Sequence, residues 1–96
     1  MTWDLRNADF LVAWSETVLM FIRELAIRNG ERSAGFDEML RITREHHQRG
    51  SVRGLRCIFR DVREFAGGLN EREQAELSGV LEQRFGRGAG KFRTPR

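Results

Sequence analysis

The stretch FLVAWSETVLMFIRELAI, residues 10–27, carries the strongest structural signal in the 96-residue chain. At 100° per residue, as in an α-helix, its largest apolar side chains fall on one stripe. Extended back toward the N-terminus, the stripe consists of Trp3, Phe10, Trp14, Phe21 and Leu25, with Leu11, Val18 and Ile22 beside it. The pattern predicts a long, aromatic-rich helix over residues 3–28.

Helical periodicity recurs in three later segments, residues 34–49, 52–66 and 71–85. Glycine, which readily adopts the left-handed conformation after a helix, follows the four helices at Gly30, Gly50, Gly67-Gly68 and Gly86. Residues that favour helix N-caps precede them: Thr2 or Asn7, Ser33, Ser51 and Asn70. No stretch has the two-residue period of a strand, and the links are short. We therefore expect an all-α fold, a compact bundle of four helices.

Each of the three shorter helices has an apolar stripe that we expect to face a shared core. The stripes are Phe36, Met39, Leu40, Thr43 and His47 in the second helix; Leu55, Phe59, Val62, Phe65 and Ala66 in the third; and Leu77, Val80, Leu81 and Phe85 in the fourth. The aromatic members are interpreted as core residues, with no cofactor role.

Basic charge is concentrated at the C-terminus. The chain has 17 Lys and Arg against 14 Asp and Glu, a net charge of +3. Residues 1–86 hold 13 arginines and all 14 acids, which gives −1, whereas residues 87–96 carry +4 and no acid. We therefore expect one helical domain over residues 1–86 and a short, disordered, flexible basic tail over 87–96. The basic pI is a property of the tail.

The first helix carries a second apolar strip, on the side away from its aromatic stripe. The strip consists of Val12, Leu19, Met20 and Ile27. A helix that is apolar most of the way round must be covered on more than one side. Either the other three helices cover the strip within one chain, or a protein partner or second copy does, making an oligomer. The second alternative makes this strip the expected partner interface.

The third helix carries a row of arginines, Arg53, Arg56, Arg60 and Arg63. Spacings of three, four and three place them within an arc of about 80°. Guanidinium groups donate paired hydrogen bonds to phosphate and remain charged. Arg41 and Arg44 form a smaller row on the second helix, and the two rows make one basic surface if the helices place them together. The alternative is that these arginines pair with acids on neighbouring helices.

Catalytic and metal chemistry lack a convincing pattern. His46 and His47 are consecutive, so they diverge by about 100° and cannot chelate together as an i, i+4 pair does. Cys57 is the single cysteine, which excludes an internal disulfide and suits a reducing compartment, the cytoplasm. No uncharged apolar run of membrane-spanning length occurs. We expect no enzyme activity, no cofactor, no metal and no small-molecule substrate. A metal or thiol enzyme using these three residues is the weakest alternative.

Two functional hypotheses follow. The first is a small non-catalytic, bacterial-type helical module, a subunit or regulator of a larger assembly. Its arginine row contacts the phosphate backbone of RNA or DNA without reading sequence. The alternative is a protein–protein adaptor or inhibitor, antitoxin-like or an assembly subunit. It binds through the first helix and contacts no nucleic acid.

Overall fold

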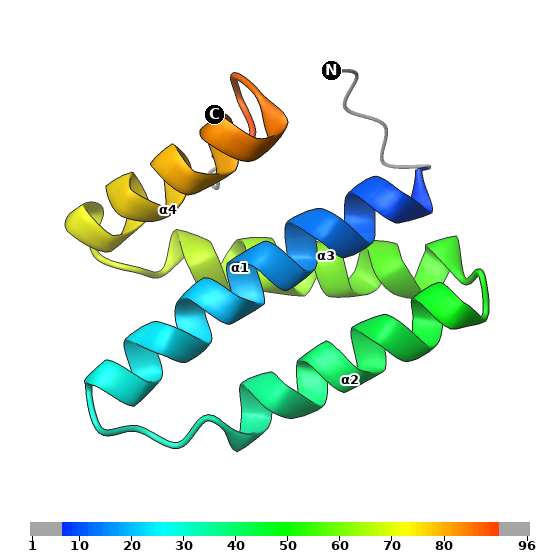
Figure 1. Ribbon diagram of the computed structural model, residues 1–96, viewed down its shortest axis with the longest axis horizontal. Helices are drawn as coiled ribbons and strands as arrows, with labels where there is room; N and C mark the ends of the chain where they lie inside the picture. Colours follow the sequence, from blue (N-terminus) through cyan, green and yellow to red (C-terminus); the bar gives the residue numbers. More distant parts are fainter. Residues whose placement is uncertain (1–6, 91–96) are drawn as a thin grey trace.

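The computed structural model describes residues 7–90, and within that range the chain forms four α-helices and no strand (Figure 1). The helices are α1 (Ala8–Arg28), α2 (Ala34–Gln48), α3 (Val52–Gly67) and α4 (Glu71–Phe85). The all-α four-helix bundle expected from the sequence is confirmed. None of these helices combines the length and the apolar character that crossing a bilayer requires.

Side-chain caps define the starts of three helices. Asn7 accepts hydrogen bonds from two N–H groups in the first turn of α1, so α1 begins one turn later than expected. Ser51 caps α3, and Asn70 and Glu73 form a reciprocal capping box at α4. Ser33 is the N-cap residue of α2, as predicted, but its side chain makes no capping hydrogen bond. The other candidate, Thr2, and the predicted core residue Trp3 lie outside the described residues.

Glycine ends three of the helices in the expected way. Gly30 and Gly50 follow α1 and α2 with φ of 73° and 69°, a left-handed conformation that few other residues adopt without strain. Gly86 after α4 also has a positive φ. Gly68 after α3 differs, with φ of −88°, because the chain continues the right-handed turn there. Its N–H bonds the carbonyl of Phe65 at 3.0 Å.

The core is built around α1, which contacts each of the other three helices. Figure 1 shows α1 crossing α3, with α2 and α4 on opposite sides of it. An aromatic cluster joins α1, α3 and α4: the ring of Phe59 lies 4.5 Å from that of Trp14, and Phe10 meets Phe85 edge-to-face at 5.7 Å. Such pairs add to the free energy gained by burying their apolar area. The fully buried side chains include Leu11, Trp14, Val18, Leu55, Leu77 and Leu81.

Two apolar residues of the predicted core are exposed instead. Phe65 on α3 has 54% of its surface exposed, and Val80 on α4 has 42%. Each lies about 80–100° around its helix from a fully buried residue, Ala66 or Leu81, at the edge of the apolar stripe. A helical wheel gives the direction of a side chain but does not show where the neighbouring helix ends.

The packed chain extends beyond residue 86, where we expected the domain to end. After α4 the backbone turns, and the indole Nε1 of Trp14 donates to the carbonyl of Ala89 at 3.0 Å. Ser78 donates to the carbonyl of Gly90 at 2.8 Å. Ala89 and Gly90 are both buried. Residues 87–90 therefore belong to the folded body, and the remainder of the predicted tail, 91–96, lies outside the described residues.

Candidate nucleic-acid interface

The arginine row lies on the part of α3 that faces away from the core. Leu55, Ile58 and Val62 point inward. Relative to that line, Arg53 and Arg60 are turned by about 170° and Arg56 and Arg63 by about 105–130°. The burial pattern agrees, since Arg53, Arg56 and Arg60 are exposed and Arg63 is half-buried. We call these four residues the α3 arginine row.

Arg53 and Arg60 form no ion pair with any residue in the range 7–90. The acids nearest to them in sequence on the same helix, Asp61 and Glu64, are also exposed and make no ion pair within that range. Seven residues separate the two arginines, so their Cα atoms lie about 10 Å apart along the helix axis, on one line. Two guanidinium groups are thus held on a rigid helix and available to an anionic ligand.

Arg41 is occupied by its own helix. Its guanidinium binds the carboxylates of Glu38 and Glu45, one turn before and one turn after it. The hydrogen bond from Arg41, together with its charge, holds the pKa of Glu38 below the ordinary glutamate value. The same pairing raises the pKa of Arg41 further above its already high value. Both groups are exposed, so this is a surface network whose main effect is to neutralise Arg41.

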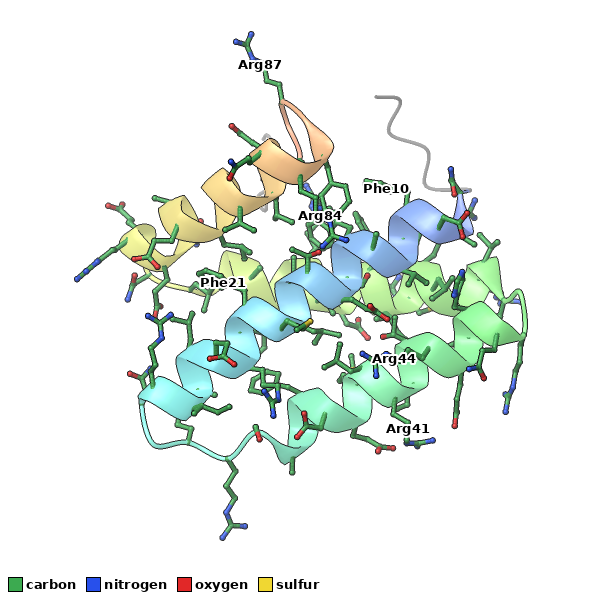
Figure 2. All side chains as sticks on the ribbon, in the orientation of Figure 1. Phe10, Phe21, Arg41, Arg44, Arg84 and Arg87 are labelled. Atoms are coloured by element: carbon green, nitrogen blue, oxygen red, sulfur yellow. The ribbon has the colours of Figure 1, made fainter. Side chains whose placement is uncertain are left out.

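Arg44 is directed to α1, where its Nε lies 3.3 Å from the carboxylate of Glu16. Figure 2 shows Arg44 between α1 and α2 and Arg41 projecting away from α2. Both predicted binding residues on α2 therefore have acidic partners; that of Arg44 lies on a neighbouring helix, as in the alternative considered, whereas those of Arg41 lie on α2 itself. The exposed pair of Arg44 with Glu16 stabilises the fold by about 0–1 kcal/mol.

Arg44–Glu16 is one of three polar side-chain contacts between α1 and α2, two of them ion pairs and the third between a histidine and a carboxylate. Asp9, Glu16 and Arg23 are spaced by seven residues, two helical turns, and so lie on one line. Their partners on α2, in antiparallel order, are His47 at 3.1 Å, Arg44 at 3.3 Å and Asp37 at 2.7 Å. We call this the α1–α2 seam. We did not predict this seam from the sequence, although three charged residues at seven-residue spacing were a usable signal.

The two arginine rows do not form one surface. Gly54 and Phe65 mark the side of α3 that meets α2: Gly54 lies against His46, and the Phe65 ring lies 5.8 Å from that of Phe36. The α3 arginine row is turned by about 150° from these two contacts. It therefore points away from α2. The predicted merger of the rows is wrong because α2 packs on the opposite flank of α3.

His46, His47 and Cys57 do not come together at one site. His46 packs on Gly54, so that glycine permits a close approach of α2 and α3 within the chain. His47, expected at the edge of the core, is instead in the seam beside Asp9, with 43% of its side chain exposed. Cys57 is exposed on the outer side of α3. Within residues 7–90, no three His, Cys, Asp or Glu side chains come together in a group able to hold a metal ion.

The predicted partner strip on α1 is divided by the fold. Leu19 has only 3% of its surface exposed and belongs to the core, and Val12 is half-buried. Met20 and Ile27 remain exposed, at 55% and 45%. Leu19 is therefore not an interface residue, because α2 and α3 already cover it. Only half of the strip is available to a partner.

Comparison with protein-family models, curated proteins and solved structures finds no match to this chain. Its function is therefore inferred from the chain's own residues.

Proposed function

We propose that this chain is a small non-catalytic helical binding module, a subunit or regulator of a larger assembly, that contacts nucleic-acid phosphates through the α3 arginine row. The observation that supports this proposal is the contrast among the arginines. Arg53 and Arg60 are exposed and form no ion pair within residues 7–90, whereas Arg41 and Arg44 are paired with acids.

The chemistry of the row favours backbone contact over base reading. A guanidinium group binds two phosphate oxygens through parallel hydrogen bonds and does not titrate near neutral pH. Residues 1–86 have a net charge of −1, so long-range attraction of a polyanion by this part is weak and local contacts must supply the affinity. Binding through phosphates displaces counterions and therefore weakens as salt rises.

The test is fluorescence anisotropy with a labelled 20-nucleotide single-stranded RNA and its DNA equivalent, at 50 and 200 mM salt. We expect Arg53→Gln/Arg60→Gln to weaken binding by about tenfold at 50 mM salt. The dependence of log K on log salt should fall by about 1.4, because roughly 0.7 is lost for each contact to a single strand. The matched control is Arg32→Gln/Arg87→Gln, which removes the same charge from two exposed residues outside the helices.

Cys57 supplies a second readout on the same helix face. It is the only cysteine in the chain, and its side chain is exposed beside the row. A bound strand should slow its reaction with a maleimide, and excess salt should restore the rate. Unprotected Cys57, together with equal affinity of the two double variants, contradicts the proposal. A lone exposed thiol also supports the cytoplasm, a reducing compartment, as the place of action.

The second candidate function is a protein adaptor or inhibitor that binds through α1 and contacts no nucleic acid. The observation in its favour is the exposure of Met20 and Ile27, which lie seven residues apart on one line of α1. Light scattering separates the two functions. A dimer that becomes a monomer in Met20→Lys/Ile27→Lys, with no oligonucleotide binding at either salt concentration, would establish the adaptor.

A further inference from the structure

An apolar pocket of about 170 Å³ opens where α2 and α3 diverge, with α1 as its floor. Figure 1 shows the two helices closest at their connecting turn and farthest apart at the other end. Gly54 lies against His46 near the closed end, and Phe36 and Phe65 stand at the open end. The pocket is lined by Leu19, Ile22, Phe36, Met39, Asp61, Val62 and Phe65.

The pocket has a buried floor and an exposed aromatic rim. Leu19, Ile22 and Val62 are each at most 3% exposed. On the rim, Phe36 and Phe65 meet edge-to-face with centroids 5.8 Å apart, and Phe65 is 54% exposed. A cavity of about 150 Å³ is sufficient to hold a benzene ring. The pocket therefore has room for one large apolar side chain.

The charge at the rim is acidic. Asp61 is the only charged residue among those that line the pocket, and its carboxylate forms no ion pair with residues 7–90. The Asp61 carboxylate repels phosphate and favours a cation next to the apolar group that enters.

We infer that this pocket binds a partner-protein segment that inserts one large apolar side chain, Phe or Leu, with Lys or Arg next to it. The apolar side chain enters beside the Phe36–Phe65 ring pair and packs on the floor formed by Leu19, Ile22 and Val62, and the adjacent cation pairs with Asp61. Asp61 is turned by about 120° from the α3 arginine row around the helix. The inference is thus independent of the proposed nucleic-acid contact, and both ligands have separate sides of α3.

The probe is the peptide Gly-Lys-Arg-Phe-Lys-Arg-Gly, blocked at both ends and titrated into the full chain. Methyl NMR follows Leu19, Ile22, Met39 and Val62. We expect saturable shifts of these four methyl-bearing residues. Replacing Phe by Ala in the peptide should weaken binding at least tenfold, and replacing its four cations by Glu should abolish it.

The protein variants test the two halves of the pocket separately. Asp61→Asn should weaken binding about threefold and reduce its salt dependence, and Phe65→Ala should weaken it about fivefold. Both positions are exposed, so the fold should survive, which circular dichroism verifies. Glu82→Gln, an exposed acid on α4, is the matched control and should change nothing.

Three results would overturn the inference. One is equal affinity for the Phe and Ala peptides. Another is a shift of the same methyl groups on raising the protein concentration without peptide, because a second copy is then the occupant. The third is an oligonucleotide that produces those shifts. Failure of the arginine-row variants to alter oligonucleotide binding leaves the peptide result unaffected, so the two proposals fail separately.

Discussion

The α1–α2 seam and the outer face of α3 hold the same residue types in opposite surroundings. In the seam, Arg23 and Arg44 lie 2.7 and 3.3 Å from carboxylates on the facing helix. On α3, Arg53 and Arg60 have no ion pair within residues 7–90. The contrast shows that the role of an arginine depends on the side chains opposite it. An arginine that faces acids on a neighbouring helix stabilises the fold, whereas one that faces no helix is available to a ligand.

The largest expected effect on stability distinguishes Leu19, which is buried on α1, from its exposed neighbour Met20. Leu19→Ala should lower the free energy of unfolding by about 2–5 kcal/mol, because it leaves a cavity under α2 and α3. Met20→Ala, at a site that is 55% exposed, should change it by less than about 0.5 kcal/mol. Urea denaturation measures both. Equal effects would mean that Leu19 is not core.

The second-largest expected effect distinguishes the α3 arginine row from Arg41 and Arg44 on α2. Arg53→Gln/Arg60→Gln should reduce oligonucleotide affinity about tenfold and leave stability unchanged. Arg41→Gln/Arg44→Gln should reduce affinity less than twofold. Arg44→Gln alone should lower stability by about 0.5 kcal/mol, through the lost pair with Glu16. Anisotropy and urea denaturation on the same samples check both. Equal loss of affinity in the two double variants would remove the distinction.

Two glycines inside helices allow the same comparison between a packed position, Gly54, and an open one, Gly79. Gly79 has open space where a Cβ would be, so Gly79→Ala should stabilise the fold by about 1 kcal/mol. At Gly54 a Cβ would collide with the imidazole ring of His46. Gly54→Ala should therefore destabilise the native chain and stabilise the His46→Ala variant. A double-mutant cycle with no coupling would show that His46 moves aside without cost.

The smallest effect concerns the pH dependence of the Arg41–Glu38 pair. The pKa of Glu38 is lowered in the fold by the hydrogen bond from Arg41. The stabilisation is fully present above the ordinary glutamate pKa of 4.5 and is lost as the pH falls through the lowered pKa. The difference in melting temperature between the native chain and Glu38→Gln should shrink between pH 5 and pH 3. A constant difference would show that the pair does not contribute.

The helices and most of their ends were predictable because the signals are local. Asn7, Ser51 and Asn70 cap the first turns that they precede, and Gly30 and Gly50 adopt the left-handed conformation expected of them. These interactions join residues at most four apart. Ser33 occupies the N-cap position of α2, but its hydroxyl donates to the carboxylate of Asp37 at 3.3 Å and makes no capping hydrogen bond.

The candidate site was predictable only in part. The spacing of Arg53 and Arg60 fixes their common direction on any helix, so the row was found. Which arginines would be paired depended on residues 28 positions away, as with Arg44 and Glu16. Leu19 and Phe65 exchanged their expected places, one in the core and one at an exposed rim, because burial depends on where the other helices end.

By itself, the sequence determined four helices, their apolar stripes, their caps and the line of arginines, since each follows from contacts within a turn or two. The packing of the helices against one another decided that Arg44 is paired with Glu16, that Leu19 is covered, and that Ala89 is held by Trp14. It also opened the apolar pocket between α2 and α3. The physical reason is that burial and ion pairing depend on which helix lies opposite. That arrangement is set by the packing of the whole core around α1.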